Sequence, residues 1–158
     1  MTPQEVRAGL RCFAASASRK LMVGVLASSK TLAGRTNKWP GRYPKMERIS
    51  EIFQVHPAAL NLIHYNTDEP ETLSDQLLRL VEISGENLHG FQLNVAWPLV
   101  EELEKFHEAT SWKQRLVLQV GGGAMARVEH SPQKFADMVA LYGGFVGVVD
   151  DVLIDPSG

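Results

Sequence analysis

Several polar residues stand at the ends of short apolar runs, and their types suit acid–base chemistry. They are His64 and Asn66 in one run, Gln92 and Asn94 in a second, and Asp155 at the end of a third. A histidine titrates near pH 6.5, so His64 can act as a general acid or base close to neutrality. Asp155 can carry the opposite proton transfer, while the amides can orient ligand hydroxyls. A structural histidine and a turn-capping aspartate are the alternative interpretations.

Two further residues join this candidate site. Gln119 shares a strand face with Gly121, two residues later, and Trp97 directly precedes a proline, where it can wall a pocket. The glycine run 121–123 can present backbone N–H groups to a phosphate. However, no helix clearly starts there, and the run matches no nucleotide-binding motif. We therefore interpret it as a flexible turn.

A basic segment supplies candidates for anion binding. Residues 1–48 contain ten Lys and Arg against two acids, and residues 49–158 contain six against sixteen, giving net charges of +8 and −10. The densest stretch contains Lys30, Arg35, Lys38, Arg42 and Lys45 and no acid. Because the acidic remainder would repel a long polyanion such as nucleic acid, we expect the first four cations to bind a small phosphorylated or carboxylated ligand. A solvated loop is the alternative.

Hydrophobic periodicity predicts alternating strands and helices around these residues. The predicted strands are 21–27, 60–66, 88–95, 115–120 and 152–155, and the predicted helices are 3–18, 47–55, 73–81, 98–109 and 132–142. The basic stretch 28–46, which contains several Gly and Pro, is predicted to be a long loop. Segment 145–149 fits either a further strand or one helical turn.

This order of elements indicates one parallel α/β domain over residues 1–158. A (β/α)8 barrel needs about 250 residues and would end here after its fifth or sixth strand, whereas an open doubly wound sheet would be complete. His64 pairs with Asn66 and Gln92 with Asn94 at a spacing of two, so polar side chains face one way. Strands of a doubly wound sheet tend to be apolar throughout. We therefore expect a C-terminally truncated TIM barrel, with the doubly wound sheet as the alternative.

Composition sets the outer bounds. A chain of 158 residues that is 44% hydrophobic and 22% charged can bury one core. No apolar run approaches the roughly 18 residues of a membrane span, and no secretory signal is evident. The single cysteine, Cys12, suits a cytoplasmic location, and its place in a predicted helix favours a buried thiol. No second His or carboxylate stands at metal-ligand spacing, so we expect no metal site and no cofactor.

Three stretches carry a resemblance to a known family. The stretches 61–66 and 88–94 resemble consecutive βα units of phosphoribosylanthranilate isomerase, in which one strand ends in Asn and the next reads "VQLHG". The stretch 152–158 is similar to the "LLLDS…GG" strand of that family. The similarity covers about residues 60–158. It implies a ribulose-phosphate-binding barrel that rearranges a phosphorylated sugar derivative.

The resemblance also implies roles for individual residues. Asp155 matches the general acid of the family's Amadori rearrangement, and Gln92 matches the strand glutamine. The family's base is a cysteine in a first strand reading "KICG", where this chain has Val23, and a valine cannot accept a proton. His64 is then the replacement base. The phosphate-binding loops would lie beyond residue 158.

We therefore expect a cofactor-independent isomerase-like enzyme that acts on a phosphorylated sugar derivative. A non-catalytic domain that binds small anions through the basic loop is one alternative. An inactive barrel fragment is another, and its two unpaired sheet edges would favour self-association.

Overall fold

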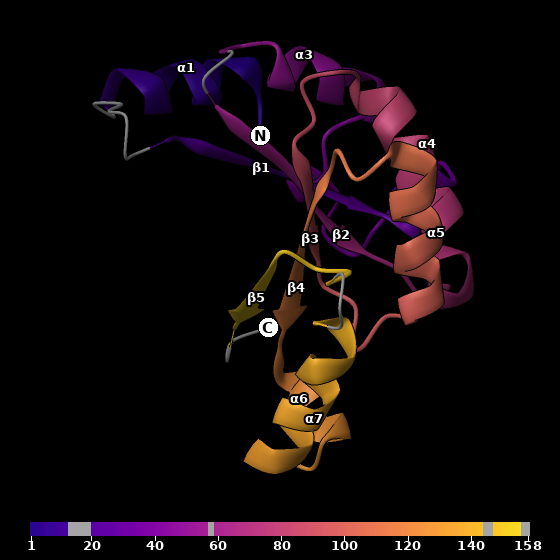
Figure 1. Cartoon of the computed structure of the whole chain (residues 1–158). Helices are drawn as coiled ribbons and strands as arrows, with labels where there is room; N and C mark the ends of the chain where they lie inside the picture. Colours follow the sequence, from indigo (N-terminus) through magenta and orange to yellow (C-terminus); the bar gives the residue numbers. More distant parts are fainter. Residues whose placement is uncertain (13–19, 57–58, 144–146, 156–158) are drawn as a thin grey trace.

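The computed structural model describes residues 1–12, 20–56, 59–143 and 147–155, which form a parallel sheet with helices (Figure 1). The strands are β1 (Met22–Ser28), β2 (Leu60–Asn66), β3 (Gly90–Leu93), β4 (Arg115–Val120) and β5 (Asp151–Ile154). Their spatial order is β1-β2-β3-β4-β5, and every neighbouring pair is parallel. The predicted parallel α/β fold is confirmed. The order of the described strands never reverses, whereas a doubly wound sheet reverses at its switch point.

The helices lie mainly on one side of the sheet. They are α1 (Pro3–Cys12), α2 (Ser29–Leu32), α3 (Ile49–Phe53), α4 (Leu73–Ser84), α5 (Val100–Thr110), α6 (Gly122–Arg127) and α7 (Pro132–Tyr142). Three short 3-10 helices are η1 (Pro40–Arg42), η2 (Met46–Arg48) and η3 (Pro70–Thr72). Figure 1 shows α1, α3, α4 and α5 in an arc along one side, with α6 and α7 near the ends of β4 and β5.

The core lies between the sheet and this arc of helices. Val25, Ile63, Phe91 and Leu116 are register partners across four strands, and all four side chains are fully buried. Phe91 meets Phe106 of α5 edge to face, with ring centroids 5.6 Å apart. Aromatic and β-branched side chains are favoured at strand positions that pack against a covering layer, here the helices. This row therefore anchors the helices to one face.

The opposite face of the sheet, which we call the inner face, is more open and more polar. Leu26, His64, Gln92 and Val117 form the next row of register partners, and each is only partly buried. Side chains alternate between the two faces of a strand, so the predicted polar residues point away from the helices. Burial on one face and polarity on the other confirm the period-two pattern.

Prediction and structure agree on the bounds of two strands, whereas β3 is shorter than the predicted strand 88–95 and covers only Gly90–Leu93. Strands 60–66 and 115–120 have the predicted bounds. The predicted long loop 28–46 instead begins with α2, whose N-cap Ser28 forms a capping box with Thr31, and it later contains η1. Of the segment 145–149, residues 147–149 form no regular element, and 145 and 146 lie outside the described residues.

The glycine run 121–123 was wrongly expected to be only a turn. Helix α6 starts within it, with Gly121 as the N-cap residue. Ala124 of α6 is buried, and α6 contacts β4. Alanine is the strongest helix former, so packing and propensity downstream outweigh the conformational cost of the glycines.

The expectation of a buried Cys12 is also wrong. Helix α1 ends at Cys12, whose side chain is exposed. Val6 is the buried residue of α1, and Cys12 follows it by six residues. At 3.6 residues per turn, that spacing places the two on different sides of the helix. The remainder of the predicted helix 3–18 lies outside the described residues.

Candidate functional site

A small cavity at the carboxyl ends of β1 and β2 gathers four of the predicted site residues. Its volume is about 140 Å³, and its lining consists of Leu26, Ala27, Arg42, Tyr43, His64, Asn66 and Asn94. His64 and Asn66 come from the inner face of β2, and Asn94 follows β3 directly. Asn66 Nδ2 donates to the Asn94 carbonyl oxygen over 3.4 Å, which joins the two strand ends.

Arg42 reaches this cavity because the basic segment folds back over the strand ends. Pro40 starts η1, as proline suits the first position of a helical turn, and Arg42 is the last residue of that turn. Asn37 Nδ2 donates to Ser28 Oγ over 2.9 Å and so ties the segment to the end of β1. Tyr43, an aromatic residue within the basic segment, lines the same cavity.

The surroundings of His64 favour the neutral form of its imidazole. Burial is the largest cause that lowers the pKa of His64 below 6.5, and the Arg42 charge lowers it further. The Asp155 charge acts in the opposite direction and raises that pKa. A neutral imidazole has a free lone pair and can accept a proton at pH 7. The geometry therefore equips His64 as a base with a cation and a carboxylate nearby.

Hydrogen bonds link Gln92, Gln119 and Asp155 across three strands of the inner face. Gln92 Nε2 donates to Gln119 Oε1 over 2.7 Å, and Gln119 Nε2 donates to Asp155 Oδ2 over 2.8 Å. Gln119 is 3% exposed, and Gln92 and Asp155 are partly buried. Asp155, predicted as the last residue of strand 152–155, directly follows β5. Residues separated by 63 positions in the sequence are thus connected side chain to side chain.

A larger cleft adjoins the small cavity, because Asn66 and Asn94 line both. It has a volume of about 590 Å³ and is also lined by Trp97, Gln119, Gly121 and Arg127. Trp97 adopts a φ of 57°, a left-handed conformation that is rare for a bulky residue and disfavoured before proline. Such strain concentrates at ligand sites. Trp97 Nε1 donates to the Ala124 carbonyl oxygen over 2.9 Å, which holds the ring against α6.

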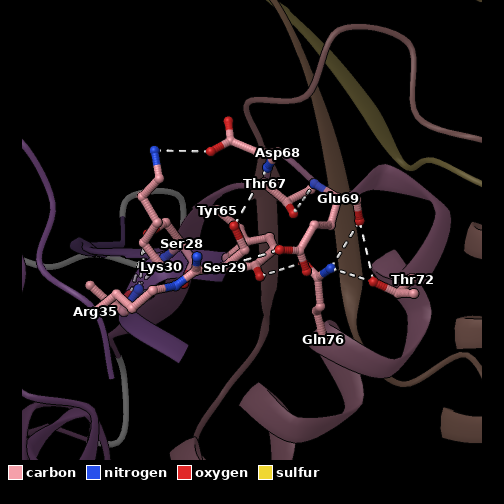
Figure 2. Close-up of polar contacts among 11 residues, drawn as sticks. Ser28, Ser29, Lys30, Arg35, Tyr65, Thr67, Asp68, Glu69, Thr72 and Gln76 are labelled. Atoms are coloured by element: carbon pink, nitrogen blue, oxygen red, sulfur yellow. Dashed lines mark hydrogen bonds and ion pairs between the residues drawn. The ribbon is translucent and has the colours of Figure 1, made fainter. Parts of the chain in front are cut away.

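Two of the predicted anion-binding cations are engaged with carboxylates. Lys30 Nζ lies 2.9 Å from Asp68 Oδ2, and Arg35 Nη2 lies 3.5 Å from Glu69 Oε1 (Figure 2). The two acids follow β2, so these ion pairs join the loops that follow two neighbouring strands. No local feature of the sequence predicts this pairing. Lys38 lies over the ring of Trp39, 5.5 Å from its centroid, and does not line the small cavity.

A hydrogen-bond network beneath these ion pairs holds the loop after β2 in place (Figure 2). Tyr65 Oη donates to Gln76 Oε1 over 2.6 Å, and Gln76 Nε2 donates to the Glu69 carbonyl oxygen over 2.9 Å. Burial, and then the Glu69 charge, raise the pKa of the Tyr65 hydroxyl. Helix α4 begins after Thr72, and no side chain of the described residues caps it. Asp68 and Glu69 therefore hold the basic loop rather than cap the helix.

Val23, where the resemblance to phosphoribosylanthranilate isomerase would require a catalytic base, does not line the cavity. Its side chain is buried, and it lies on the helix-facing side of β1 together with Val25. Leu26, on the inner face, contributes to the cavity instead. Strand β1 thus contributes no proton-transfer group to the lining of the small cavity.

The described residues contain neither a metal-binding cluster nor a membrane-spanning helix. No group of three or more His, Cys, Asp or Glu within them is arranged to hold a metal ion. No helix in the same part of the chain combines the length and apolarity needed to cross a bilayer.

No family model, curated protein or solved structure matches this chain.

Proposed function

We propose that the chain forms part of a (β/α)8 barrel that binds a phosphorylated sugar derivative and isomerises it by acid–base catalysis. The observation that carries this proposal is the shared cavity of Arg42, His64, Asn66 and Asn94 at the carboxyl ends of parallel strands. Active sites of barrel enzymes lie at that end of the sheet. The resemblance to phosphoribosylanthranilate isomerase supports the same substrate class.

Three features of the sheet favour a barrel over a doubly wound sheet. The described strands follow one another without reversal, α3, α4 and α5 lie along one side, and the other face carries the polar residues. The chain of Gln92, Gln119 and Asp155 adds a fourth feature. Each step crosses one strand and advances two residues beyond the register partner. Tilted, staggered strands of a barrel produce such a rise.

The proposed isomerisation requires a base and an acid of the protein that act on the same ligand. Conversion of an aldose derivative into a ketose derivative removes a proton from C2 and delivers one to C1, with a proton exchanged between the oxygen or nitrogen atoms. Neutral His64 accepts the C2 proton. Asp155, which is ionised in the ligand-free chain, takes up a proton when the ligand binds and donates it to the opening sugar. Asn66, Asn94 and Gln92 orient the hydroxyls, and Arg42 pairs with an anionic group. Electrons and atoms balance without an oxidant or cofactor.

Binding of sugar phosphates tests the ligand class. We expect ribose 5-phosphate and ribulose 5-phosphate to bind in isothermal titration calorimetry, more tightly than inorganic phosphate. Arg42→Ala should weaken binding by about 10-fold or more, since a hydrogen bond to a charged group contributes about 1.5–3 kcal/mol. Lys38→Ala is the matched control, because this cation lies on the same segment outside the cavity. Equal losses in both variants would contradict a specific Arg42 site.

Turnover tests the catalytic step. NMR of the bound sugar phosphates should reveal conversion between the aldose and ketose forms. Asp155→Asn should lower that rate by on the order of 10²–10⁴-fold while leaving stability nearly unchanged. Binding without conversion in the unaltered chain would instead favour the non-catalytic anion-binding domain.

A further inference from the structure

Gln119 is better placed to hold its neighbours than to contact a ligand. Both ends of its amide are hydrogen-bonded, to Gln92 and to Asp155, and its side chain is 3% exposed. A buried amide whose NH2 and C=O groups both already form hydrogen bonds has little capacity to bind a substrate. This burial contrasts with Gln92, which is only partly buried on the same face.

The chemistry of the three groups makes the hydrogen-bond chain directional. An ionised carboxylate only accepts hydrogen bonds, so Gln119 must turn its Nε2 toward Asp155. Gln119 Oε1 then faces Gln92 and accepts a hydrogen bond from Gln92 Nε2. The Oε1 atom of Gln92 takes no part in this chain, and it can accept a hydrogen bond from a ligand hydroxyl.

We infer that Gln119 is a positioning residue that holds the Asp155 carboxylate toward His64 and fixes which end of the Gln92 amide meets the ligand. The inference rests on the proposed function for the roles of Asp155 and His64. It changes the expected role of Gln119 from ligand binding to the orientation of two residues that contact the ligand.

The consequence is measurable at His64 without any ligand. Within the described part of the chain, two charged groups act on this imidazole, Arg42 from η1 and Asp155 from the end of β5. The carboxylate favours the imidazolium form, so its displacement lowers the pKa of His64. If Gln119 holds the Asp155 carboxylate in place, replacement of Gln119 should also lower the pKa of His64, although Gln119 carries no charge.

The experiment is an NMR titration of the histidine side chains in the intact chain. The five histidines are distinguished by the signal that disappears in His64→Gln. Asp155→Asn should move the His64 midpoint to lower pH, and Gln119→Met should reproduce most of that shift. The His64 midpoint in the double variant should shift no further than in Asp155→Asn alone, because Gln119 then has no carboxylate charge to position.

Gln76→Met is the matched control. Gln76 is also buried, and both ends of its amide are hydrogen-bonded, to Tyr65 and to Glu69, away from Asp155. We expect it to leave the His64 midpoint unchanged. Gln119→Asn, which is one methylene too short to reach both partners, serves if Gln119→Met fails to fold.

An unchanged His64 midpoint in the Gln119 variants, or an equal shift in the Asp155→Asn background, would overturn the positioning role. A role limited to packing would not depend on Asp155 in this way. Because the titration requires no substrate, it can succeed even if no sugar phosphate binds. The two proposals therefore fail separately.

Discussion

Gly90 is the position where the smallest change should disturb both the sheet and the candidate site. A methyl group on Gly90 would run into the backbone carbonyl of Arg115 on β4, which cannot rotate away. Strands β3 and β4 must then separate, two residues before Gln92 donates to Gln119. Gly24 is the matched control, because it lies in the same register row and an added methyl there meets nothing.

The magnitude follows from two opposing effects. Replacing a strand glycine by alanine gains about 0.5–1 kcal/mol, because the unfolded chain loses freedom. Forced contacts in a packed interior cost about 1–3 kcal/mol, and contact with backbone belongs at the upper end. We therefore expect Gly90→Ala to lose about 2 kcal/mol and Gly24→Ala to be neutral or slightly stabilised. For a chain of this size, the first change corresponds to a fall in Tm of about 4–8 °C.

Urea denaturation followed by circular dichroism measures both free energies of unfolding. The midpoint should fall for Gly90→Ala at an unchanged m value, since the surface exposed on unfolding is the same. Equal stability of the two variants would refute the close approach of β4 to β3 at this position. It would also remove the reason for a glycine there.

Two further predictions concern charge and the sheet edges. The pKa of His64 is lowered in the folded chain, so the contribution of His64 to stability should be complete above pH 6.5 and should decline as the pH falls below 6.5. In urea titrations at several pH values, His64→Gln should flatten this dependence of the free energy of unfolding on pH. An equal slope in both would contradict the lowered pKa. At the edge, β5 exposes Leu153 and Ile154, so we expect concentration-dependent association in sedimentation velocity, weakened by Ile154→Lys. A monomer at all concentrations would argue against edge pairing.

The sequence by itself determined the order of the strands and the side of the sheet on which the candidate residues lie. Alternation at a spacing of two is a local property, so His64 and Asn66 could be assigned to one face before any packing was known. The carboxyl-end rule for parallel strands then brought Asn94 to the same edge. Strand 60–66 has its predicted bounds for the same reason.

Only the tertiary structure decided which of these residues meet. Lys30 and Arg35 were expected to bind an anion, yet they pair with Asp68 and Glu69, because two loops distant in sequence fold against each other. Nothing local separates these cations from Arg42, which reaches the cavity instead. The burial of Gln119 between two partners depends likewise on the lateral order and stagger of three strands. Periodicity assigns a residue to a face of its own strand, whereas hydrogen bonds and ion pairs form between strands and loops that the chain brings together only on folding.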